Sequence, residues 1–281
     1  MFEVKKYGSP WNMNKEGYFI PDADINKVIT PYREVVDDLV KAYLENAKEE
    51  IHSIYIRGTV ARGNAVYGVS DLDSYAITYR EVPAEKGQWV SVEEKSIAEK
   101  HPCITGVQIG LLPKLLFESN GAARYMRFVL ETQSACVYGQ DLTPQMESFG
   151  LNKYVLNFDI SYIETAIHKV LEAIHVNDSS DNVELECHHL MKKVVRTGLS
   201  LVASEENVYS RDLGYCYEYF SKVFPNKSLE MKKAVKWSIH PTNDKNELEF
   251  YLHTFGAWLI ERANEWLAIH NPSREFEMSL K

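Results

Sequence analysis

A glycine turn that joins a strand-like segment to a later acidic strand constrains the fold of this chain more than any other feature. The segment Ser53-Ile54-Tyr55-Ile56 has the composition of a buried strand, and Gly58-Thr59 follows it almost at once. After a spacer of about ten residues comes Ser70-Asp71-Leu72-Asp73, which opens an alternating segment that ends near Tyr79. This order of strand, turn, spacer and acidic strand predicts an α/β layer in which the turn and the carboxylates lie together.

The two carboxylates are expected to point the same way. Residues two apart on a strand share a face, so Asp71 and Asp73 lie on one side of the sheet and Leu72 on the other. Two carboxylates on one face are costly unless a cation lies between them. Hard oxygen ligands in this arrangement suit Mg²⁺, which usually keeps several waters and is completed by phosphates. The pair therefore predicts a metal site.

The turn before the acidic strand has the chemistry of a phosphate site. Gly58 lets a phosphate approach the backbone without a side chain in the way, and the Thr59 hydroxyl offers a hydrogen bond to an oxygen. Arg62 is close enough in sequence to reach the same charge, and Ser70 directly precedes the acidic pair. We therefore assign Gly58, Thr59, Arg62 and Ser70 to a nucleotide-binding set beside the metal.

At these residues the chain resembles the nucleotidyltransferase superfamily that includes DNA polymerase beta and the aminoglycoside nucleotidyltransferases. Ile56-Arg57-Gly58-Thr59 matches the first half of the family pattern and Asp71-Leu72-Asp73 the second, with Thr59 in the place of the usual serine. The resemblance implies that Asp71 and Asp73 are catalytic metal ligands for one or two Mg²⁺ ions, with ATP or another nucleoside triphosphate as substrate. The segment Tyr138-Gly139-Gln140-Asp141-Leu142 resembles the motif that closes many such domains. Its Asp is expected to cap a turn or the next helix, and the alternative is a contact to the acceptor or the nucleotide.

The chain departs from the family at the third carboxylate. That group is expected on a third strand within residues 103–112, and Gln108 stands in its place, with no Asp or Glu from His101 through Phe117. Glutamine accepts a hydrogen bond but neither takes a proton nor neutralises a cation. A base from another segment can replace it, and the alternatives are Glu118, Glu131, Glu184 and Glu186, although each is better explained as a helix-surface charge.

The organisation along the chain predicts two domains and an α+β fold. Thr30-Pro31 predicts a helix start, with Thr30 as its N-cap, ahead of the first strand. Ser91 and Glu94 predict a capping box for a later helix, and strands and helices alternate to about residue 155. From about Asn157 onward only helical periods occur. We expect a small mixed-sheet nucleotidyltransferase domain over residues 1–155 and an all-α bundle of four or five helices over residues 156–281.

The acceptor side of the site is expected in the helical domain by resemblance alone. In the aminoglycoside-modifying relatives the acceptor lies against such a bundle, which points to the second bundle helix around Glu184, His188 and Lys192. Lys192 or Arg62 is expected to offset charge on the leaving group. Gln108, Glu184 and His188 are candidates for the base or for contacts to the acceptor.

Composition bounds the class of partner. The net charge of −9 comes from 31 basic and 40 acidic residues, and the chain gives little sign of the basic face that nucleic-acid binding needs. The N-terminus lacks the apolar core of a signal peptide, no run is long enough to span a bilayer, and the four cysteines have no CxxC spacing. We therefore expect a cytoplasmic protein with reduced cysteines, a nucleotide and a small-molecule acceptor as ligands, and neither a nucleic-acid nor a membrane partner.

Two functions of different classes fit these residues. The first is a Mg²⁺-dependent enzyme that moves a nucleoside monophosphate, most simply AMP from ATP, to a hydroxyl of a small molecule. The second is a protein of the same fold that has lost turnover with the third carboxylate and serves in nucleotide or partner binding. The sequence specifies neither the acceptor, nor the nucleotide, nor the oligomeric state.

Overall fold

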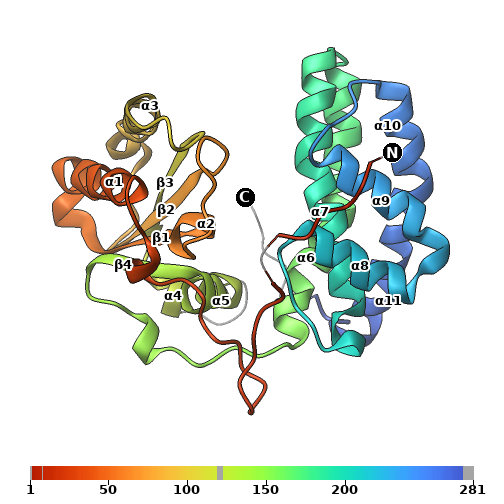
Figure 1. Ribbon diagram of the computed structural model, residues 1–281, viewed down its shortest axis with the longest axis horizontal. Helices are drawn as coiled ribbons and strands as arrows, with labels where there is room; N and C mark the ends of the chain where they lie inside the picture. The colour runs from red at the N-terminus through yellow and green to blue at the C-terminus, as the bar shows by residue number, and fades with distance from the viewer. Residues whose placement is uncertain (1, 8, 119–122, 275–281) are drawn as a thin grey trace. The chain divides into compact units, whose positions relative to one another are not determined.

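The structure, a computed structural model, describes residues 2–7, 9–118 and 123–274 and divides into two compact units (Figure 1). One unit is Asn14–Phe149, and the other joins Met1–Met13 to Gly150–Lys281. This division differs from the expected one, because the first 13 residues belong with the helices. The backbone N–H of Trp11 donates to the carbonyl of Tyr209 (2.9 Å), and the Trp11 ring packs edge-on against the Tyr209 ring.

The first unit is a four-stranded mixed sheet with helices on both faces. The strand order is β3-β2-β1-β4, in which β1 is antiparallel to both neighbours and β2 is parallel to β3. Its main elements are α1 (Tyr32–Ala47), β1 (Ile51–Arg57), α2 (Gly58–Ala61), β2 (Leu72–Thr78), α3 (Val90–Lys100), β3 (Val107–Pro113), α4 (Leu115–Glu118), α5 (Ala123–Gln133) and β4 (Ser134–Gly139). Short 3₁₀ turns are at Ile25–Lys27, Lys48–Glu50, Ala84–Gly87 and Thr143–Gln145.

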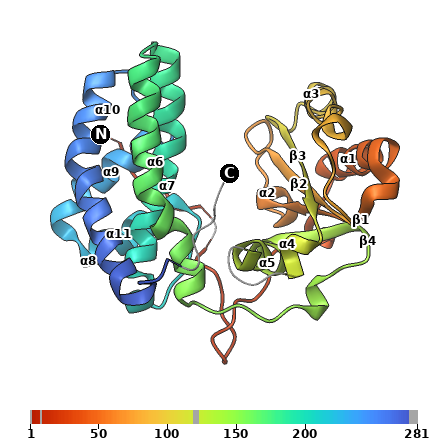
Figure 2. The same ribbon diagram turned by 180° about the vertical axis from the view of Figure 1, so that it is seen from behind.

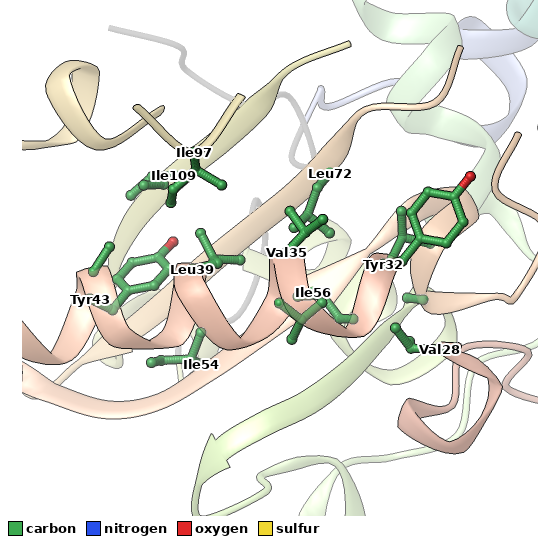
Figure 3. Close-up of a cluster of buried hydrophobic side chains, with 14 of the residues drawn as sticks. Val28, Tyr32, Val35, Leu39, Tyr43, Ile54, Ile56, Leu72, Ile97 and Ile109 are labelled. Atoms are coloured by element: carbon green, nitrogen blue, oxygen red, sulfur yellow. The ribbon is translucent and has the colours of Figure 1, made fainter. Parts of the chain in front are cut away.

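One face of the sheet packs against α1 and α3. The apolar stripe of α1 inserts Val35 and Leu39 between side chains of β1 and β2, as Figure 3 shows, and all of these are fully buried. The Tyr43 hydroxyl also hydrogen-bonds to Ser74 (3.0 Å) and to the Gly110 carbonyl (3.1 Å). The predicted N-cap was wrong, because α1 begins at Tyr32 and its N-cap is Pro31 rather than Thr30.

The other face is covered by α4 and α5 and has a more aromatic core. The rings of Tyr55 and Tyr75 stack with centroids 5.7 Å apart, and Leu130 of α5 packs on them. The Tyr55 hydroxyl donates to Asp141 (3.1 Å) and accepts from the backbone N–H of Leu142 (2.8 Å). Asp141 in turn accepts from the backbone and hydroxyl of Thr143, so it caps a turn as predicted.

The second unit is helical, and Figure 2 shows its long antiparallel helices from behind. Its elements are α6 (Lys153–Val176), α7 (Ser180–Glu206), α8 (Leu213–Val223), a 3₁₀ turn (Pro225–Lys227), α9 (Ser228–Trp237), α10 (Lys245–Tyr251), a π turn (Leu252–Gly256) and α11 (Ala257–His270). α10, the π turn and α11 follow one another without a break and form one long helical segment. The α+β class, with a small mixed sheet followed by an all-α bundle, is confirmed. Among the described helices, none combines the length and the apolar character that a membrane crossing requires.

Candidate active site

A row of three side chains crosses the sheet where β2 begins. In the strand register, Asp73 of β2 lies opposite Arg57 of β1 on one side and opposite Gln108 of β3 on the other. Paired residues of adjacent strands share a face, so this row lies on the same face as Tyr55 and Tyr75. The register places Gln108 beside Asp73, where the resemblance leads one to expect a carboxylate.

The acidic pair stands at the start of β2, as the alternation predicted. Leu72 is fully buried on the α1 face, whereas Asp71 is exposed and Asp73 is partly buried. The pKa of Asp73 is raised, because partial burial, the largest cause, and the charge of Asp71 outweigh the opposing effect of Arg57. The two carboxylates therefore interact electrostatically, and that repulsion favours a cation between them.

The glycine turn lies against the same carboxylate. Gly58 has a φ of +82°, a left-handed conformation that residues with a side chain rarely adopt, and a Cβ placed there would be 3.7 Å from Asp73 Oδ2. The Thr59 hydroxyl donates to Ser70 Oγ (3.0 Å), which also accepts from the Val66 backbone N–H (2.9 Å). Ser70 thus fixes the orientation of Thr59, a contact that the sequence alone did not suggest.

Of the two arginines near the turn, the structure favours the one that sequence reasoning missed. Arg62, predicted to reach the phosphates, pairs its Nε with Asp22 (2.8 Å), a carboxylate that Lys27 also contacts (2.7 Å). Burial opposes the shift, but the hydrogen bonds from Lys27 and Arg62 hold the pKa of Asp22 below its ordinary value. Arg57, in contrast, places its Nε 3.5 Å from Asp73 Oδ2. The sequence places Arg57 directly before Gly58. That position indicates a contact with Asp73 only once the pairing of β1 with β2 is known.

The residues present fit a metal that arrives with phosphate. Within the described ranges no group of three or more His, Cys, Asp or Glu side chains is arranged to hold an ion. Mg²⁺ is usually held by one or two carboxylates, with waters and substrate phosphates as the remaining ligands. Asp73 on β2, which lies beside the turn, and Asp71 directly before that strand supply two such carboxylates.

The alternative bases take different places in the chain. The side chain of Glu118 lies outside the described residues, and Glu184 and Glu186 are on α7 of the helical unit. Glu131 is on α5, where its Oε2 is buried without a hydrogen-bond partner in the described part of the chain. Burial raises the pKa of Glu131 to about 7, so this residue is not the ordinary surface charge that the sequence suggested.

Replacing Glu131 by glutamine is expected to stabilise the protein at pH 8 but not at pH 5. The pKa of Glu131 is higher in the folded chain than in the unfolded one. The free energy of unfolding therefore falls as the pH rises from the unfolded pKa towards about 7, and above about 7 it falls no further on account of Glu131. With allowance for solvent screening, Glu131→Gln should gain about 1 kcal/mol in the free energy of unfolding at pH 8. Urea titrations at the two pH values measure this. The exposed Glu85→Gln is the control, and a Glu131→Gln effect independent of pH would contradict the prediction.

The three helical-domain candidates share one stripe of α7. Glu184, His188 and Lys192 are four residues apart, with Glu184 exposed and the other two partly buried. Burial, followed by the charges of Lys192 and His189, lowers the pKa of His188. Their parts in nucleotide or acceptor binding stay predictions.

Comparisons with known proteins agree with the fold. No protein-family model and no curated protein matches the chain. Among solved structures, it is similar to spectinomycin adenyltransferase AAD(9) from Enterococcus faecialis, determined with ATP and spectinomycin. That match has a TM-score of 0.51 and 9% sequence identity, and it covers 83% of this chain and 99% of the other. At this identity the likeness shows the fold alone. The chain therefore shares the fold of this adenyltransferase, with a mixed-sheet unit and a helical unit.

Proposed function

We propose that this protein is a Mg²⁺-dependent nucleotidyltransferase that moves a nucleoside monophosphate, most simply AMP from ATP, to a hydroxyl of a small-molecule acceptor. The observation that carries the proposal is the convergence of Asp71, Asp73 and the Gly58-Thr59 turn at one end of β2. The similar structure was determined with ATP and an antibiotic, which supports a nucleotide and a small acceptor as the ligand classes.

In the proposed reaction the acceptor oxygen attacks the α-phosphorus of the nucleotide. A new oxygen–phosphorus bond forms, the bond from the α-phosphorus to the bridging oxygen breaks, and pyrophosphate leaves with that electron pair. Asp71 and Asp73 would hold the metal, which would neutralise charge on the phosphates. The Gly58 turn lets the phosphates approach the backbone. Arg57 beside Asp73 is a cation at this end of the sheet, and Lys192 remains the predicted cation of the helical domain.

The hydroxyl proton must pass to solvent water or to a base other than Asp71 and Asp73, because those two carboxylates would hold the metal. Gln108, which lies beside Asp73 in the register, cannot take a proton. That single observation favours a second function, in which the fold binds a nucleotide or a partner without turnover. Nucleotide binding and turnover are therefore to be measured separately.

Calorimetric titration of ATP with and without Mg²⁺ tests the shared first step. Wild-type protein is expected to bind ATP in a Mg²⁺-dependent manner, and the Asp71→Asn, Asp73→Asn double variant is expected to lose that dependence because both metal ligands become neutral amides. An Asp37→Asn, Asp178→Asn double variant makes the same charge change at two exposed positions and should bind like wild type.

Pyrophosphate release then separates the two functions. Release that depends on a hydroxylated acceptor, in a screen of aminocyclitols, sugars and nucleosides, identifies the enzyme. Mg²⁺-dependent binding without release in that screen supports the non-catalytic alternative. If neither ATP nor any other nucleoside triphosphate binds, the enzyme proposal is wrong, and only partner binding is left of the second function.

A further inference from the structure

The ion pair between Arg57 and Asp73 occupies the place where the proposed metal would bind. Arg57 is the last residue of β1 and lies directly opposite Asp73, with its Nε 3.5 Å from Oδ2. The two side chains are only 35% and 28% exposed, so solvent screens this pair less than a fully exposed one. Arg57 lies on the same face of the sheet as Tyr55 and Tyr75, because alternate residues of a strand share a face.

Arg57 and the glycine turn at Gly58 both lie close to one oxygen atom of Asp73. Asp73 Oδ2, the atom that Arg57 contacts, is also the atom 3.7 Å from where a Cβ of Gly58 would lie. Asp73 is also one of the two residues that would hold the proposed metal. The guanidinium and the metal would therefore compete for the same carboxylate.

The net charge at this end of the sheet makes that competition effective. Asp71 and Asp73 carry two negative charges and Arg57 one positive charge, which leaves one net negative charge because Gln108 is neutral. One negative charge attracts a divalent cation weakly against its hydration. A triphosphate supplies the missing negative charge and also offers oxygens to the displaced guanidinium, which binds phosphate in a bidentate manner.

We propose that Arg57 is a built-in counter-ion of Asp73 that makes metal binding depend on the nucleotide. The site excludes a bare divalent cation, but it admits a metal–triphosphate complex, whose phosphates then bind the guanidinium. Only the admission of the complex rests on the proposed function. The exclusion of the bare cation concerns this chain's own ion pair and is testable without ATP. Arg57 acts here as a positioning residue that couples the two ligands.

Binding of Mn²⁺, followed by the loss of the free-ion signal in electron paramagnetic resonance, tests the inference. Without nucleotide, Arg57→Gln should bind Mn²⁺ about tenfold more tightly than wild type, because the competing charge is gone. With an ATP analogue that cannot release pyrophosphate, the same variant should bind the analogue about tenfold more weakly, because a charged hydrogen bond to phosphate is lost. The opposite signs distinguish this role from a merely structural one.

Two further variants keep the test interpretable. Arg80→Gln removes the same charge at an exposed position beyond the other end of β2 and should leave both affinities unchanged. Arg57→Lys keeps the charge and the fold and should bind bare Mn²⁺ as weakly as wild type.

The outcomes separate the inference from the proposed function. If Arg57→Gln binds bare Mn²⁺ no more tightly than Arg80→Gln while wild type binds Mn²⁺ with the analogue, the inference is overturned and the proposed function stands. If Arg57→Gln binds bare Mn²⁺ more tightly but wild type does not bind the analogue, Arg57 is a counter-ion of Asp73 and the proposed function is wrong.

Discussion

Replacing Gln108 with glutamate is expected to raise the pyrophosphate-releasing activity of this protein by about two orders of magnitude. The register already places residue 108 beside Asp73, so the new carboxylate joins the acidic pair without any change of backbone. A positioned general base contributes roughly 10²–10⁴-fold to a rate, and a third carboxylate also strengthens metal binding. Water serves as the acceptor in this assay, so the measurement, release of pyrophosphate from ATP, needs no knowledge of the natural acceptor.

The same variant has a second expected property that does not depend on turnover. Three carboxylates beside the single guanidinium of Arg57 keep a net negative charge and repel one another without a metal. Gln108→Glu should therefore melt at a lower temperature than wild type in a chelator and regain that loss on addition of Mg²⁺. Gln88→Glu introduces the same change at an exposed position before α3 and should show neither effect. If Gln108→Glu is stabilised by Mg²⁺ no more than Gln88→Glu, the side chain of residue 108 does not face the metal site.

Replacing Gly139 with alanine is expected to lower the free energy of unfolding by about 3 kcal/mol. Gly139 ends β4 with a φ of +80°, and a Cβ at this position would lie 2.2 Å from the carbonyl oxygen of His52 and 2.9 Å from the Cα of Ser53. Both atoms belong to the backbone of β1, which neighbours β4 in the sheet, so neither can move aside without breaking strand pairing. Urea-induced unfolding followed by circular dichroism measures the loss.

Gly106→Ala provides the comparison for that measurement. A Cβ at Gly106 meets no heavy atom within 4 Å, so the added methyl group should change stability by no more than about 0.5 kcal/mol. If Gly106→Ala and Gly139→Ala lower the free energy of unfolding by the same amount, the steric explanation is wrong.

The parts of the site that the sequence predicted are those set by local order along the chain. A strand, a glycine turn and Asp71-Leu72-Asp73 define their own geometry, because alternation on β2 fixes which side chains share a face. Gln108 lies opposite Asp73 because the third strand pairs in register with β2, and its part in the site stays a prediction.

The parts that the sequence did not predict depend on residues far apart in the chain. Arg62 was expected at the phosphates, but Asp22, 40 residues earlier, binds it. The predicted capping box was also wrong. Ser91 lies inside α3, and Glu94 accepts a hydrogen bond from the backbone N–H of Ile109 on β3, which is an edge strand of the sheet. In both cases a tertiary partner outcompetes a local one, and no periodicity shows that partner.

The grouping of the first 13 residues with the helices makes the α/β unit an insertion in terms of chain connectivity. The helical unit is made of two pieces of sequence, Met1–Met13 and Gly150–Lys281, whereas Asn14–Phe149 is one uninterrupted segment. A fragment of residues 14–149 therefore contains all of its own unit, but one that starts at Gly150 leaves out the segment whose Lys6 pairs with Glu218 and whose Tyr7 N–H donates to Asp212. Two covalent crossings, at 13/14 and 149/150, also tie the units together, so a cut in either connection alone leaves them joined.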